Sequence, residues 1–211
     1  MLFKQVLQAL NYIHSLNIAH RDIKPENFLF ETKEKDSALK IIDFGLSKII
    51  TNDKMGQAKS KDSSKKKKME EQGRMNTVAG TPNYVSPEVL AGNYSLDCDM
   101  WSAGCLLYIL LCGYPPFDGD DDYELSQNIL KGRVEFDGEE WEEISKEAKN
   151  LINNLICKPE KRLTAGEALQ HKWFKKTLGD VKQKIDLRGL NFQDAATHNQ
   201  MKQVAMTAIS V

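Results

Sequence analysis

Apolar residues near the start of the chain recur at the spacing of a helix. Four of them lie three or four positions apart: Leu2, Val6, Leu10 and Ile13. The pattern predicts an amphipathic helix over residues 1–16 that ends at Asn17. Two short runs of strand-forming residues follow, at 28–30 and 39–42, joined by the charged stretch ETKEKDS. We expect these runs to form a small β-hairpin beside the first helix.

The longest apolar stretch, residues 100–117, lies near the middle of the chain. It is interrupted by serine and glycine and flanked by aspartates, so it falls short of a membrane span. It predicts a buried central helix over 97–111, closed by Gly113 and Pro115.

Three further helices are predicted, over 120–130, 141–157 and 164–169. The last begins with a capping box, because Thr164 is followed three residues later by Glu167. The expected fold is therefore mostly α with a small β-hairpin, an α+β fold.

Residues 51–76 differ in character from the rest of the chain. They carry eight basic and four acidic residues and almost no apolar ones. Such a segment cannot bury enough surface to offset the entropy of ordering, so it is predicted to be a disordered insertion. The run Lys65–Lys68 is compatible with a nuclear-import patch and, more simply, with a solvated loop.

Charge and cysteine usage narrow the class of protein. The 211 residues carry a net charge of −1, which argues against a nucleic-acid-coating protein. The N-terminal stretch contains polar residues and is not a secretory signal.

Three cysteines lie seven residues apart on one predicted helix: Cys98, Cys105 and Cys112. Neighbours in this series are about 10 Å apart along the helix axis. That separation excludes a disulfide or shared metal among them, so we expect free thiols and a cytoplasmic location.

The residues that carry chemistry begin with HRDIKPEN at 20–27, between the first helix and the first strand. Asp22 can accept the proton of an attacking hydroxyl, and Asn27 offers an oxygen ligand. Asp43, sixteen residues further on, is followed by phenylalanine and glycine and adds a carboxylate. Hard oxygen ligands are what Mg²⁺ needs when it also bridges nucleotide phosphates.

These motifs resemble those of the protein kinase family. The octapeptide fits H-R-D-x-x-x-x-N, and D-F-G follows in the expected order. The sequence at 86–88 is Ser-Pro-Glu where the family has A-P-E, and DMWSAG at 99–104 resembles the motif of the family's central helix. Arg162 matches the arginine that pairs with the glutamate of A-P-E, here Glu88. The resemblance covers residues 1–174.

The resemblance implies roles for individual residues. Lys24 is the form typical of serine/threonine kinases and would steady the transferring phosphate, while Asp22 is the catalytic base. Thr81 would help to seat the substrate hydroxyl. Thr77 occupies a position that many relatives phosphorylate, and a phosphate there would pair with Arg21. ATP and Mg²⁺ are the implied cofactors, and proteins are the implied substrates.

Several residues are expected to be structural. His20 would pack and hydrogen-bond near Phe44, Asp99 belongs to the central-helix motif, and Glu88 with Arg162 would form a buried pair. Four aromatic residues are expected to pack in the core: Tyr12, Trp101, Trp141 and Trp173.

Acidic residues around position 120 suggest an EF-hand at first sight. Tyr123 and Ile129 stand where a calcium loop needs glycine and glutamate, so this is not a calcium site. The acidic residues form either a surface for basic substrates or a plain solvated face: Glu26, Asp118, Asp120, Asp122 and Glu124.

Within the family, TVAGTPNYVSPEVL and GYPPFDGDD resemble the calmodulin-dependent and calcium-dependent kinases. The tail, 175–211, resembles their regulatory junction, which implies a calcium sensor domain or a calmodulin-like regulator as partner. Its last 25 residues, 187–211, carry an apolar stripe at helical spacing: Met201, Val204, Ala205, Ala208 and Ile209. We expect an inhibitory helix that folds back on the catalytic part; a plain packing helix is the alternative.

No two glycines in this chain are closer than six residues, so G-x-G-x-x-G is absent. The chain is therefore expected to be the C-terminal lobe of a kinase without the N-terminal lobe, inactive in isolation. The alternatives are a catalytically inactive, kinase-like interaction module and an incomplete gene product.

Overall fold

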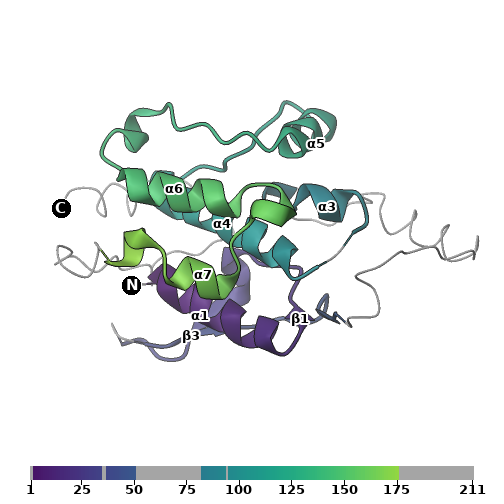
Figure 1. Cartoon of the computed structure of the whole chain (residues 1–211), viewed down its shortest axis with the longest axis vertical. Coiled ribbons are helices and arrows are strands. Elements are labelled where there is room, and N and C mark those ends of the chain that lie inside the picture. The colour runs from purple at the N-terminus through teal and green to yellow at the C-terminus, as the bar shows by residue number, and fades with distance from the viewer. Residues whose placement is uncertain (1, 35–36, 51–81, 94, 176–211) are drawn as a thin grey trace, which may run out of the picture.

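The computed structural model of the chain describes residues 2–34, 37–50, 82–93 and 95–175 (Figure 1). Some sequence predictions lie outside these residues and stay predictions: the disordered insertion at 51–76 with its Lys65–Lys68 run, the positions of Thr77 and Thr81, and the tail beyond residue 175.

The first part of the chain forms one helix and two short strand pairs. Helix α1 spans Leu2–Ser15 and buries Val6, Leu10 and Ile13 of the predicted apolar stripe, whereas Leu2 is half-buried. Asn17 after the helix has a left-handed φ of 57°. Strands β2 (Phe28–Phe30) and β3 (Leu39–Ile41) form the predicted antiparallel hairpin. A second antiparallel pair, β1 (Ile18–Ala19) with β4 (Lys48–Ile49), was not predicted.

Helix α4 is the central element of the second part. It spans Asp97–Cys112, is buried along nearly its whole length and ends at Gly113, whose φ is 88°. This confirms the predicted central helix and its glycine stop. Short helix α3 (Pro87–Leu90) precedes α4. Three-residue 3₁₀ turns complete the framework: η1 (Pro25–Asn27), η3 (Pro82–Tyr84), η4 (Glu139–Trp141) and η5 (Pro159–Lys161).

The remaining helices differ from their predicted bounds where a side chain caps the backbone. Helix α5 spans Asp122–Lys131, because Asp121 accepts a hydrogen bond from the Glu124 backbone N–H. Helix α6 spans Lys146–Leu155 and is shorter than the predicted 141–157 at both ends. Ser145 caps its start, and the backbone leaves the helical conformation at Ile156, whose ψ is 73°. Helix α7 spans Ala165–Leu169 and has the predicted capping box.

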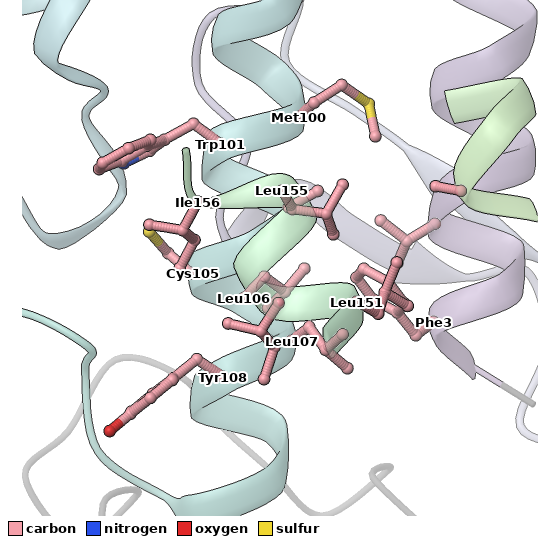
Figure 2. Close-up of a cluster of buried hydrophobic side chains, with 14 of the residues drawn as sticks. Phe3, Met100, Trp101, Cys105, Leu106, Leu107, Tyr108, Leu151, Leu155 and Ile156 are labelled. Carbon is pink, nitrogen blue, oxygen red and sulfur yellow. The ribbon is translucent and has the colours of Figure 1, made fainter. Parts of the chain in front are cut away.

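The core lies between α4 and its neighbours. In Figure 1, α6 lies beside α4, while α1 and α7 pack together beneath them; α5 stands at the opposite edge. Figure 2 shows part of the buried cluster, to which α4 contributes Leu106 and Leu107, α6 contributes Leu151 and Leu155, and α1 contributes Phe3. This arrangement buries α4 on most sides, which is why its apolar residues show no single stripe.

Three of the four predicted core aromatic residues are buried, namely Trp101, Trp141 and Trp173. The prediction for Tyr12 is wrong. Tyr12 is 67% exposed because it lies about 200° around the helix from Leu10, on the solvent side of α1.

The cysteines are free thiols, as predicted, with Cys98, Cys105 and Cys112 buried. Burial raises the pKa of all three thiols, to about 12 in the case of Cys112. Within the described ranges, no helix is long and apolar enough to cross a membrane.

Candidate active site

The candidate catalytic loop, residues 20–27, connects β1 to the β2–β3 hairpin and carries backbone strain. Arg21 has a φ of 71°, in the left-handed region that favours glycine. Such a conformation costs about 1–3 kcal/mol and persists only where the surroundings hold it. The buried carboxylate of Asp99, on α4, accepts hydrogen bonds from the backbone N–H groups of His20 and Arg21, both at 2.7 Å. Asp99, which the sequence placed only in the central-helix motif, thus holds this loop by two hydrogen bonds.

His20 is fully buried and is structural, as predicted. Its Nε2 lies 3.0 Å from the carbonyl oxygen of Ile42, and its ring packs edge-on against Phe44 with the ring centres 4.9 Å apart. The Asp22 backbone N–H donates to Nδ1. One neutral tautomer, with its proton on Nε2, satisfies both hydrogen bonds.

Asp22 is held by two neighbours through one of its carboxylate oxygens. Oδ2 accepts from the Asn27 amide at 2.8 Å and pairs with the Lys24 ammonium at 2.8 Å. The Asn27 amide also donates to the Asp22 carbonyl oxygen at 2.7 Å. Among the described residues nothing donates to Oδ1, which leaves this oxygen for a substrate hydroxyl. The side chains of Asp22 and Lys24 remain partly exposed, at 24% and 32%.

Ile42, the residue before Asp43, is hydrogen-bonded to the loop through both its N–H and its carbonyl group. The Ile42 N–H donates to the Asn27 carbonyl oxygen at 2.9 Å, and the Ile42 carbonyl accepts from His20. Asp43 itself is exposed, has a φ of 61° and accepts a hydrogen bond from the Gly45 N–H. Asp43 therefore directly follows Ile42, which these two hydrogen bonds hold against the loop.

Asn27 and Asp43 fit the role of magnesium ligands. Both amide hydrogen bonds of Asn27 go to Asp22, and no hydrogen bond to its Oδ1 is found in the described part of the chain. Asp43 uses one oxygen for Gly45 and keeps the other. An amide and a carboxylate oxygen are hard donors of the kind that Mg²⁺ accepts together with substrate phosphates and water.

Glu88 and Arg162 form the predicted pair between α3 and the segment after α6. The guanidinium makes a two-pronged contact with the Glu88 carboxylate. It also donates to the carbonyl oxygens of Asp97 and Cys157 and lies 5.2 Å from the Trp101 ring centre. The Arg162 side chain is fully buried, and the pair links α3 to the segment after α6.

Glu26 is exposed and lies near the segment that follows the insertion. Tyr84 has a raised pKa, first because it is buried and second because the Glu26 carboxylate is close. The Tyr84 carbonyl oxygen accepts from the Ser102 hydroxyl at 2.6 Å, which ties this segment to α4. The roles of Tyr84 and Ser102 were missed in the sequence, although both belong to motifs that it contains.

The other acidic residues around position 120 make local hydrogen bonds. Asp118 accepts from the Gly119 N–H, and Glu124 accepts from the Asp120 N–H. The structure brings the loop residues 20–27 together with Asp43 and Asp99. The acidic residues around position 120 lie instead at the start of α5.

Comparison with known proteins agrees with this arrangement. The family model for the protein kinase domain matches residues 1–174. Calcium-dependent protein kinase 3 of Plasmodium berghei (strain Anka) is 46% identical over 213 residues, which cover 99% of this chain and 35% of that protein. Calcium/calmodulin-dependent protein kinase type 1 of Macrobrachium nipponense is 46% identical over 174 residues, which cover 82% of this chain and 45% of that protein.

The chain therefore spans about a third to under a half of the length of these relatives. The family model begins at residue 1 and covers the catalytic loop, Asp43, the Glu88–Arg162 pair and α4. The chain belongs to the protein kinase family, near the calcium-dependent and calmodulin-dependent serine/threonine kinases.

Proposed function

We propose that this chain supplies the substrate- and magnesium-binding half of an ATP-dependent serine/threonine protein kinase. The observation that carries the proposal is the state of Asp22. One carboxylate oxygen is occupied by Lys24 and Asn27, while the other accepts no hydrogen bond from the described residues. A carboxylate held in this way is oriented to accept a proton from a serine or threonine hydroxyl.

In this mechanism the Asp22 Oδ1 hydrogen-bonds the substrate hydroxyl and takes its proton as the hydroxyl oxygen bonds to the γ-phosphorus of ATP. The bond from that phosphorus to the bridging oxygen breaks, and ADP leaves. Lys24, 2.8 Å from Asp22, is close enough to neutralise charge on the transferring phosphate. Asn27 and Asp43 would hold Mg²⁺, which supplies charge neutralisation when bound.

Turnover also requires nucleotide to be clamped from the opposite side. Phosphoryl transfer depends on positioning and charge stabilisation, and the 211 residues contain no glycine-rich loop. We propose that these residues act as a C-terminal lobe and need an N-terminal lobe for activity. The absence of a glycine-rich loop from these residues also favours the second candidate function, a kinase-like module that binds proteins without turnover.

Replacement of the proposed base tests the function. The experiment uses a chain that also carries a complete nucleotide-binding lobe, with saturating peptide and Mg-ATP. Asp22→Asn is expected to lower kcat at least about 10²-fold, because an amide cannot accept the proton. Asp43→Ala should lower activity and raise the Mg²⁺ concentration that is needed. The matched control is Asp137→Asn, an exposed aspartate between α5 and η4. Near-normal turnover in Asp22→Asn would contradict the proposal.

Regulation by a calcium sensor is part of the proposal, supported by the calcium-dependent and calmodulin-dependent names of the relatives. We infer that residues 187–211 inhibit the lobe through their apolar stripe. Met201→Glu with Ile209→Glu should raise basal activity in the longer chain, because the stripe could no longer be buried. Gln203→Glu with Ser210→Glu adds the same charge to the opposite face and should have no effect. Equal activity of the two double variants would contradict inhibition by this segment.

A further inference from the structure

One buried contact beside the candidate catalytic loop has no part in the chemistry described above. His14 lies in the last turn of α1, and its Nε2 is 2.9 Å from the Asp99 Oδ2. The His14 side chain is 11% exposed and that of Asp99 is fully buried. The contact joins the end of α1 to the first turn of α4 across 85 positions of sequence.

The contact completes the set of donors on a buried carboxylate. The Asp99 Oδ1 accepts from the Arg21 N–H, and Oδ2 accepts from both the His20 N–H and His14. The Cys98 thiol is a weak fourth donor, with its Sγ 3.9 Å from Oδ1. The two strong donors besides His14 are backbone groups of the loop itself, so His14 supplies the short side-chain hydrogen bond that anchors the carboxylate from outside the loop. A buried carboxylate that loses a donor has no solvent to replace it.

Asp99 in turn holds the strained residue that precedes the base. Arg21 keeps its left-handed φ of 71° only while its N–H and its surroundings favour that conformation. A carboxylate free to rotate would weaken its hydrogen bond to Arg21, and relaxation of Arg21 would shift Asp22. Displacement of a reacting group by about 1 Å can lower a rate by about 10²-fold.

We propose that His14 is a positioning residue that acts through Asp99. Its ring N–H fixes the orientation of the Asp99 carboxylate, which keeps Arg21 in its strained conformation and Asp22 in place. The effect on turnover rests on the proposed function, whereas the effect on the loop does not.

The variants separate the hydrogen bond from the side-chain volume. His14→Leu keeps the volume and removes the donor. His14→Gln restores an N–H at the reach of Nε2, whereas His14→Asn is too short to do so. The matched control is His171→Leu, which removes a histidine side chain bonded at 3.0 Å to Asn150, away from the loop.

Two measurements are made on each variant. Amide hydrogen exchange by NMR reports on His20 and Arg21, and steady-state kinetics in the chain that carries a nucleotide-binding lobe reports kcat and KM. In His14→Leu and His14→Asn we expect exchange at Arg21 to accelerate about tenfold or more and kcat to fall tenfold to about a hundredfold, with KM little changed. In His14→Gln, Arg21 exchange and kcat should return most of the way to the parent values. In His171→Leu, neither Arg21 exchange nor kcat should change.

The outcomes are distinguishable. If the parent enzyme transfers no phosphate, the proposed function fails, and exchange at Arg21 alone decides the positioning role. If His14→Leu does not fold, the comparison of His14→Gln with His14→Asn decides it. Equal Arg21 exchange in these variants and the parent would overturn the proposal, as would a loss of kcat that His14→Gln does not recover.

Discussion

Ser86 stands where the kinase motif has alanine, and its hydroxyl is buried. The side chain is 1% exposed, and no described residue is within hydrogen-bond reach of Oγ. An unpaired buried hydroxyl costs about 1–3 kcal/mol. Ser86→Ala is therefore expected to leave the free energy of unfolding unchanged or to raise it by about 1 kcal/mol, measured by urea denaturation. A loss of more than 1 kcal/mol would mean that the hydroxyl has a partner outside the described residues. Ser145→Ala, which removes the α6 cap, is the control that should destabilise.

The grouping of the site residues in one loop could be predicted from the sequence, but their conformations could not. Asp22 and Asn27 are recognisable because they are polar residues at fixed spacing in one loop. Nothing local predicts a left-handed Arg21, because the group that stabilises it, Asp99, is 78 positions away. His14 was missed for the same reason, since its partner lies on another helix.

At the scale of the elements, α4 and α6 approach closely at Gly104. A β-carbon placed there would be 2.7 Å from the Ile156 Cγ1 and 2.9 Å from the Leu155 Cβ. Alanine would gain about 1 kcal/mol of helix propensity, but overpacking typically costs 1–3 kcal/mol. We therefore expect Gly104→Ala to destabilise the protein in thermal unfolding.

Gly166 in α7 is the matched control. Its nearest neighbour is the Asn11 Oδ1 at 3.2 Å, the end of a flexible side chain. Gly166→Ala should be neutral or stabilise by up to about 1 kcal/mol. If both glycine variants behave alike, close packing of α4 on α6 is not what requires glycine at position 104.

Helices with strong periodicity, a long apolar run or a capping box were predictable as elements, and α1, α4 and α7 are the respective examples. The start of α6 was placed too early because Trp141 and Ile144 continue its apolar pattern, although Trp141 belongs to η4. The β1–β4 pair carries two residues on each strand, too few for an alternating pattern. Only the return of the chain past Asn17, whose carbonyl accepts from the Ile50 N–H, creates this pairing.

At the scale of the whole molecule, the proposal that these residues form half of an active site predicts the behaviour of the 211-residue chain alone. We expect isothermal titration calorimetry to show no tight binding of Mg-ATP, and a peptide assay to show no turnover, because the phosphates lack a second set of donors. Tight binding with turnover that Asp22→Asn abolishes would show that the 211 residues suffice.

The same proposal predicts poor solubility. Three large apolar residues that follow the proposed magnesium ligands in sequence are exposed: Leu29, Phe44 and Leu46. Exposed apolar surface favours association, so light scattering should rise with concentration. Fusion to a nucleotide-binding lobe should suppress that scattering if the lobe covers these residues. Unchanged scattering would show that the lobe does not cover them.

The dependence of the catalytic loop on Asp99 has a consequence for biosynthesis. A ribosome completes the whole HRDIKPEN motif and Asp43 long before it adds Asp99, which lies 79 positions after His20. A nascent or prematurely terminated chain that ends before α4 thus contains every residue of the proposed chemistry without the carboxylate that shapes the loop. If the proposed function holds, catalytic competence is acquired late in translation, and products truncated before α4 would be inactive.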